Sequence, residues 1–294
     1  ENSVGVINLT DRIDGKRFTK KDLKLLSTIA NQAMACLHIR DLVKELHQSA
    51  CLKREMENVQ RIQASYLPKQ SPIVAGFDIA GRCAMAQAAG GDYFDFFLKG
   101  HFLYVAIADV AGHDTTSAVT MVNLRARLAS LIAYEKLPAR ILDQLNTGLF
   151  ADLSHLEQFI SCLLVRINTQ TGECVVANAG HYPPLFFSGQ VLLGESGLVL
   201  GVDSTETYCD EFVTLAPDDG LLIYTDGVIE STARDGSLFG IDRLKKIIAQ
   251  SKKDPSAPLR ARKIVDSIIK TVTVDQTGQR QRDDVTVVVV KRSV

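Results

Sequence analysis

The stretch of sequence that decides the fold is residues 159–179, which read FISCLLVRINTQTGECVVANA. Two runs rich in apolar and β-branched residues, 159–167 and 173–179, are separated by the polar segment 168–172, which includes a glycine. Two such runs joined by a short turn are typical of a β-hairpin. The two strands are therefore predicted to pair antiparallel, which argues against a doubly wound parallel sheet.

Strand-like and helix-like patterns continue on both sides of this hairpin. Six further apolar, β-branched runs are predicted to be strands: 77–83, 93–98, 102–110, 211–215, 221–225 and 285–290. Helical periodicity covers four segments: 115–135, 139–153, 241–250 and 257–274. Antiparallel sheets covered by helices follow from this pattern, so the predicted fold class is α+β.

A long segment without glycine or proline, residues 17–67, precedes the strands. It begins with Thr19 and Asp22 in a capping-box-like arrangement, and Pro68 follows it, so we expect one or two long helices. Apolar or small residues recur along it at steps of three and four: Leu26, Ile29, Ala33, Cys36, Ile39, Val43, Leu46 and Ala50, then Leu52, Met56 and Val59. This pattern fits a coiled-coil seam of a homodimer or an amphipathic helix packed on its own domain, and the length favours the dimer.

Composition narrows the class of protein. The chain has 294 residues, 46% hydrophobic and 23% charged, with a formal net charge of −1. These values exclude a disordered chain, a collagen-like repeat and a strongly basic nucleic-acid binder. The six cysteines form no CxxC pair, which favours a reduced, cytoplasmic protein. Because no apolar run reaches the roughly 18–20 residues that span a bilayer, no membrane segment is expected in this chain.

Aspartates stand where predicted strands meet turns. Asp92 follows two glycines, Asp109 ends an apolar run, Asp226 precedes Gly227, and the pair Asp283–Asp284 directly precedes a strand. A carboxylate at the end of a buried strand is held rigidly and reaches solvent, which suits a ligand of a hard divalent cation. Any single one of them is more simply explained as a turn residue, so the case for a metal site depends on the whole set.

Five motifs occur in the order found in bacterial phosphatases. They are GGDYFD at 90–95, ADVAGH at 108–113, NAGHYPP at 178–184, YTDGVIE at 224–230 and DDVT at 283–286. Residues 62–291 therefore resemble the PPM-type (protein phosphatase 2C-like) serine/threonine phosphatases of sporulation and stress signalling. The resemblance implies a four-layer α/β/β/α sandwich of two antiparallel sheets flanked by helices.

The resemblance also implies a site with two Mn²⁺ or Mg²⁺ ions. Asp109 would bridge the ions with the backbone carbonyl of Val110 as a further ligand, Asp226 and Asp283 would complete one ion, and Asp92 would serve the other. Asp109 and Asp226 are the residues that we expect to be catalytic. Two such ions activate a bridging water for in-line attack on a phosphate ester, so no covalent intermediate is needed. Asp284 is expected to orient Asp283 or to cap the turn.

This sequence departs from the family pattern in two places. Asp114 replaces a usual glycine and can cap the following helix, and Ala111 stands where the animal enzymes carry a histidine. The general acid is therefore unassigned, with His113 as a candidate or a turn residue. His181 is expected to shape its loop, and Arg82 is either a phosphate ligand or an exposed strand residue.

Residues 5–12 and 18–33 look like the closing strand and last helix of a GAF sensor domain. The predicted organisation is a GAF-like fragment at 1–40, a helical linker at 41–67 and the phosphatase domain at 68–294. The predicted function is a protein serine/threonine phosphatase regulated by an upstream sensor, and the resemblance implies that its substrate is a phosphorylated anti-sigma-factor antagonist. The alternatives are a catalytically inactive, dimeric phosphatase-like scaffold and a hydrolase of small phosphomonoesters.

Overall fold

The computed structural model describes residues 5–86, 90–112, 115–192, 194, 196–232, 237–251, 260–275 and 283–293. The chain divides into two compact units, Glu1–Glu55 and Met56–Val294, which are described separately. Among the described residues, none of the helices combines the length and the apolar character needed to cross a membrane.

Helix α1 (Lys20–Tyr66) is a single unbroken helix that begins in the first unit and ends in the second. Its start has the predicted capping box, because Thr19 N donates to Asp22 Oδ2 over 2.7 Å and Asp22 N donates to Thr19 Oγ1 over 3.4 Å. These bonds satisfy backbone groups that a helix start otherwise leaves unpaired. The seam residues Ile29 and Val43 are 51% and 45% exposed in the single chain.

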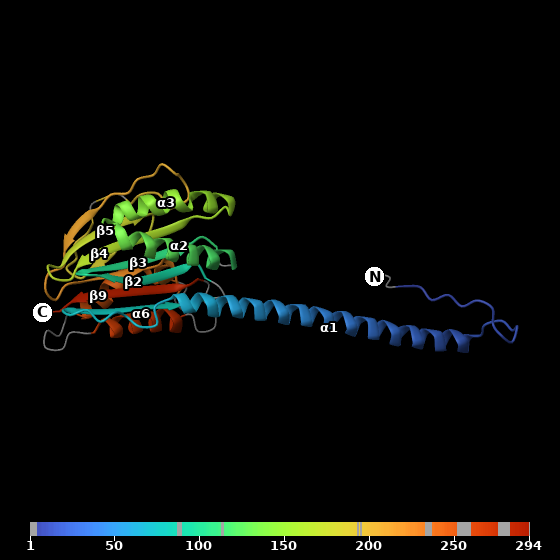
Figure 1. Ribbon diagram of the computed structural model, residues 1–294. Helices are drawn as coiled ribbons and strands as arrows, with labels where there is room; N and C mark the ends of the chain where they lie inside the picture. The colour runs from blue at the N-terminus through green and yellow to red at the C-terminus, as the bar shows by residue number, and fades with distance from the viewer. Residues whose placement is uncertain are drawn as a thin grey trace. The chain divides into compact units, whose positions relative to one another are not determined.

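The second unit contains two antiparallel sheets (Figure 1). The four-stranded sheet has the order β1 (Phe77–Ala84), β9 (Val285–Arg292), β8 (Gly220–Tyr224) and β6 (Leu185–Phe186). The five-stranded sheet has the order β2 (Asp92–Lys99), β3 (Phe102–Val110), β4 (Ile160–Asn168), β5 (Glu173–Ala179) and β7 (Glu211–Thr214). Strands β4 and β5 pair antiparallel, as predicted from the hairpin pattern.

Helices cover the outer face of each sheet. Figure 1 shows α2 (Thr115–Tyr134) and α3 (Pro138–His155) over the five-stranded sheet and α6 (Ala261–Asp275) on the opposite side. Helix α5 (Gly240–Ser251) packs with α6, and α4 (Asp226–Ile229) is a single turn. Three hydrophobic clusters separate the layers, one under α2 and α3, one between the sheets and one under α5 and α6. The predicted four-layer α/β/β/α sandwich is therefore confirmed.

The strands and helices predicted between residues 77 and 290 are all present, and their ends within the described residues differ by at most two residues, while the predicted helix start at 257 lies outside the described residues. Residues 5–12, expected as the closing strand of a GAF domain, form no strand in the structure, so that expectation was wrong. Two elements were not predicted, the two-residue strand β6 and the one-turn helix α4. Both are too short to show a periodic pattern. Helix α4 follows directly after β8 and begins at Asp226, so the missed element lies in the predicted site.

Candidate active site

Hairpin β2–β3 brings two of the predicted ligands together. The pairing places Asp92, the first residue of β2, directly opposite Asp109 near the end of β3. The turn between the strands consists of Gly100 and His101, and Gly100 has a φ of 59° that suits glycine. Because this short turn fixes the register, the two carboxylates are held at the same edge of the sheet.

Asp92 also joins the two sheets. Its side chain is buried, and its Oδ2 atom accepts hydrogen bonds from the hydroxyls of Thr225, 2.8 Å away, and Thr286, 2.6 Å away. Thr225 directly follows β8 and Thr286 lies on β9, and both of these strands belong to the four-stranded sheet. Thr286 N in turn donates to Thr225 Oγ1 over 3.0 Å. Hydrogen bonds from both threonines therefore orient the Asp92 carboxylate.

A narrow space in front of Gly91 is lined by oxygen atoms. A Cβ atom at Gly91 would lie 2.2 Å from the carbonyl oxygen of Val110 and 2.7 Å from Asp109 Oδ1. Val110 N donates to the carbonyl oxygen of Gly91 over 3.1 Å, which holds the two segments together. Only glycine fits this close approach. The structure therefore brings the predicted carbonyl ligand next to the predicted bridging carboxylate.

The remaining aspartates come from the ends of β8 and β9. Asp226 Oδ1 accepts a hydrogen bond from Gly227 N over 2.7 Å, and Asp283 Oδ1 accepts one from Asp284 N over 2.8 Å. The two turns touch, since a Cβ atom at Gly227 would lie 1.9 Å from the backbone oxygen of Asp284. Asp284 Oδ1 accepts a hydrogen bond from Ala86 N, so this side chain ties the turn to the segment after β1.

The electrostatics of the site reflect this convergence. Burial and the charges of Asp226, Asp283 and Asp284 raise the pKa of Asp109 to about 7. Burial and the charge of Asp109 raise the pKa of Asp92 well above its ordinary value. Burial and Asp283 likewise raise the pKa of Asp226. Carboxyls that hinder one another's ionisation form a site that favours a bound cation.

The donor set fits Mg²⁺ or Mn²⁺. Carboxylate and carbonyl oxygens are the ligands that these ions prefer. Within the described ranges, no group of three or more His, Cys, Asp or Glu side chains is placed so that it could hold a metal ion by itself. Mg²⁺ does not require such a group, since it is usually bound by one or two carboxylates and keeps several waters. Asp92, Asp109, Asp226, Asp283 and the Val110 carbonyl are the groups that would hold the ions.

The predicted histidines have different outcomes. His113 and Asp114 lie outside the described residues. His181 is buried, its Nδ1 lies 2.8 Å from Ser161 Oγ, and burial lowers its pKa to about 4. The side chain of Asn178 fixes the backbone of His181, because its Nδ2 donates to His181 O and its Oδ1 accepts from His181 N. A neutral, enclosed imidazole in such a loop fits the predicted loop-shaping role.

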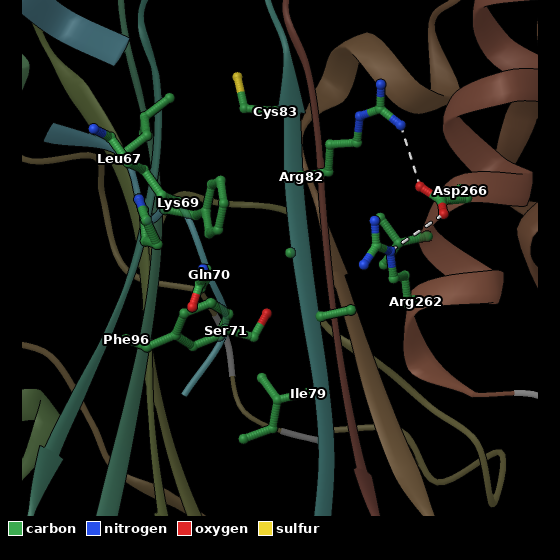
Figure 2. Close-up of a pocket in the computed structure, with 15 residues that line it drawn as sticks. Leu67, Lys69, Gln70, Ser71, Ile79, Arg82, Cys83, Phe96, Arg262 and Asp266 are labelled. Atoms are coloured by element: carbon green, nitrogen blue, oxygen red, sulfur yellow. Dashed lines mark hydrogen bonds and ion pairs between the residues drawn. The ribbon is translucent and has the colours of Figure 1, made fainter. Parts of the chain in front are cut away.

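Arg82 lines a pocket of about 640 Å³ beside the edge strand β1 (Figure 2). Its Nη1 atom lies 3.2 Å from Asp266 Oδ1 on α6, and Arg262 approaches the same carboxylate at 3.8 Å. Figure 2 shows both arginines reaching Asp266 on α6. Arg82 thus forms an ion pair with Asp266 on α6 and not with the aspartates of the candidate metal site. Cys83 also lines this pocket, and burial raises the pKa of its thiol, with a further rise from the charge of Asp92.

Three groups near the aspartates were not predicted from the sequence: Gln63, Thr225 and Thr286. Thr286 lies within the motif at 283–286 and Thr225 within the motif at 224–230, so position in a motif was a usable signal for both. Gln63 lies outside all five motifs, and its contact with Gly90 depends on the tertiary fold.

Comparison with protein families gives a match over residues 99–293 to the model of stage II sporulation protein E (SpoIIE). Phosphoserine phosphatase RsbU of Bacillus subtilis is 27% identical over 247 residues, which cover 83% of this chain and 71% of RsbU. Phosphoserine phosphatase RsbP of the same organism is also 27% identical, over 66% of this chain. The matched region covers 49% of RsbP, so this chain corresponds to about half of that relative.

Solved structures share the fold. The SiaA-PP2C domain of Pseudomonas aeruginosa superposes with a TM-score of 0.70 at 20% identity, covering 84% of this chain and 98% of that domain. The PP2C phosphatase domain of SpoIIE from Bacillus subtilis, solved with a fragment of its regulatory domain, has a TM-score of 0.60 at 19% identity. That match covers 75% of this chain and 64% of the solved chain. The two-sheet sandwich is therefore a PP2C-type fold.

Proposed function

Because this chain belongs to the SpoIIE family of PP2C-type serine/threonine phosphatases, we propose that it hydrolyses phosphoserine or phosphothreonine on a signalling protein by a metal-dependent mechanism. One observation carries the proposal: the pairing of β2 with β3 sets Asp92 opposite Asp109, at the edge where Asp226 and Asp283 also arrive. This is the aspartate set that the family resemblance requires. We further propose that the substrate is a phosphorylated anti-sigma-factor antagonist, as the resemblance to stress-response phosphatases implies.

The residues of the chain have distinct tasks in this mechanism. Asp109 and the Val110 carbonyl form the shared centre of the donor set, with Asp226 and Asp283 on one side and Asp92 on the other. Thr225 and Thr286 hold the Asp92 carboxylate in place. When bound, divalent ions at these donors would lower the pKa of a bound water and offset the negative charge of the phosphoryl oxygens.

The chain also carries features that bear on regulation. Ile29, Val43 and Met56 on α1 are exposed at 51%, 45% and 46% in the single chain. We propose that this seam pairs two copies, that residues 1–40 are the end of a GAF-like sensor domain, and that 41–67 link it to the phosphatase domain at 68–294. The exposure of apolar side chains at heptad-like spacing supports the pairing.

The proposed activity can be tested with phosphate release from a phosphoserine protein in the presence of Mn²⁺. We expect EDTA to abolish release, and Asp109→Asn and Asp226→Asn each to lower kcat by at least about 100-fold, because charge-stabilising groups are typically worth that much. Asp218→Asn, an equally conservative change at an exposed turn, serves as the matched control.

Activity that survives EDTA, or that both active-site variants retain, would contradict the two-metal mechanism. Binding of the phosphoprotein without any phosphate release would instead favour the inactive scaffold. Release from small phosphomonoesters but never from a phosphoprotein would favour the small-molecule hydrolase.

A further inference from the structure

Gln63, in the last turn of α1, is a buried polar residue. Its exposed fraction is 1%, whereas Ile62, Ala64 and Ser65 beside it are exposed. Both the nitrogen and the oxygen of its amide form hydrogen bonds with the same residue, Gly90. The Nε2 atom donates to the carbonyl oxygen of Gly90 over 2.5 Å, and the Oε1 atom accepts from Gly90 N over 3.1 Å. One side chain thus satisfies both backbone polar groups of a buried glycine.

Gly90 begins a three-residue segment, Gly90–Gly91–Asp92, which we call the glycine loop. The loop also packs against the acidic cluster. A Cβ atom at Gly90 would lie 1.6 Å from Asp284 Oδ2, and one at Gly91 would lie 2.2 Å from the Val110 carbonyl oxygen. The loop is therefore held between the Gln63 amide and the predicted metal donors, and it ends at Asp92.

A second contact connects the same helix turn to α2, which in turn contacts β2. The guanidinium of Arg125 lies over the ring of Tyr66, 5.7 Å from its centre, and Arg125 Nε lies 2.9 Å from Asp95 Oδ2. Tyr93 OH donates to the same carboxylate over 3.1 Å. The last turn of α1 thus contacts the residue two positions before β2 through Gln63, and Tyr66 is connected to β2 only through Arg125 of α2.

We propose that Gln63 is a positioning residue that sets the affinity of the cation served by Asp92. This inference rests on the proposed function, because it assigns a role to a residue near the same metal donors. Without the amide, both polar groups of Gly90 would be buried without partners, and the loop would be fixed on one side only. The Asp92 carboxylate would then be displaced relative to Asp109, while Asp226 and Asp283 would keep their places.

The test uses the full chain and calorimetric titration with Mn²⁺. Gln63→Leu and Gln63→Met remove both hydrogen bonds by introducing an apolar side chain of similar length. If one of these variants fails to fold, the other is used for the measurement. Gln48→Leu, the same change at an exposed position of α1, is the matched control. We expect the Gln63 variants to bind one of the two Mn²⁺ ions roughly 10- to 100-fold more weakly, as for other residues that support metal ligands.

The selectivity of the loss separates positioning from general damage. The affected site is expected to be the one that Asp92→Asn weakens, with the other site and the control unchanged. The positioning role would be overturned if the Gln63 variants bound Mn²⁺ at both sites as tightly as the unmodified chain does. It would also be overturned if both sites lost affinity to the same extent. Backbone hydrogen exchange in EDTA gives an independent reading, and the amides of the glycine loop should exchange faster in the Gln63 variants.

An unmodified chain that binds no Mn²⁺ would overturn the proposed function. The positioning of the loop by Gln63 would then be decided by hydrogen exchange alone. Faster exchange confined to residues 90–92 would support it, and unchanged exchange would overturn it.

Discussion

Asp109→Asn is expected to stabilise the metal-free protein at high pH while it removes activity. In the folded chain the pKa of Asp109 is about 7, raised by burial and by the charges of Asp226, Asp283 and Asp284, against an ordinary value of 3.8. Between these two values the folded state keeps a proton that the unfolded state has lost. The free energy of unfolding therefore falls as the pH rises through this window.

The size of the effect follows from the two pKa values. A rise from 3.8 to about 7 corresponds to about 4 kcal/mol at 1.36 kcal/mol per pKa unit. Water that reaches the partly exposed carboxyl reduces this, so we expect about 1–3 kcal/mol. Asparagine carries no charge at any pH in this range. The variant should thus exceed the unmodified protein in stability by that amount at pH 8, and the difference should shrink toward zero near pH 4.

Urea unfolding in EDTA, followed by circular dichroism across this pH range, measures the difference. Titrating groups away from the aspartate cluster, including His181, are common to both proteins and cancel when the variant is compared with the unmodified chain at each pH. Asp92 does not cancel, because Asp109 helps to raise its pKa, and its response to the variant has the same sign. Asp218→Asn, which changes an exposed aspartate, controls for the loss of one negative charge. A difference that does not change with pH, or a variant less stable at pH 8, would refute the argument that the carboxylates repel one another.

Three further predictions concern other parts of the chain. Arg125→Met should lower the free energy of unfolding by about 2 kcal/mol in urea titrations, because it leaves the buried Asp95 carboxylate without its charged partner; unchanged stability would contradict this. Since the pKa of His181 is lowered to about 4, stability is expected to fall as the pH drops below about 6.5, and His181→Gln should lessen that fall. A slope that the variant leaves intact would refute the assignment. Light scattering should show dimers that the pair of changes Ile29→Asp and Val43→Asp converts to monomers, and a monomeric unmodified chain would refute the seam.

Local patterns predicted most of the fold. The hairpin at residues 159–179 was predictable because its strands and its turn are adjacent in the chain, and β4 and β5 form as expected. The long helix was predictable from the capping pair at Thr19 and Asp22 and from the absence of breakers until Pro68. The two-residue strand β6 carries no periodicity, so it depends on pairing with β8 and could not be read from its own residues.

Sequence patterns singled out the candidate donors but not the groups that contact them. Asp92, Asp109, Asp226 and Asp283 stood out because each ends or begins a strand-like run. Their supporting groups lie far away in sequence, since Thr225 and Thr286 are 133 and 194 positions from Asp92. Which distant hydroxyl meets which carboxylate depends on how the two sheets stack, and no local pattern encodes that.

The cost of the aspartate cluster bears on whether the chain is an enzyme or a scaffold. In the absence of a cation, burial and mutual repulsion raise the pKa of Asp92, Asp109 and Asp226, so the ionised forms destabilise the fold near neutral pH. A protein that acts only by docking has no physical need for this arrangement and would be more stable with asparagine at any of these positions. Cation binding offsets the repulsion and stabilises the folded state by mass action. Because only a bound cation offsets the destabilising repulsion within this cluster, its presence supports an enzyme over a scaffold.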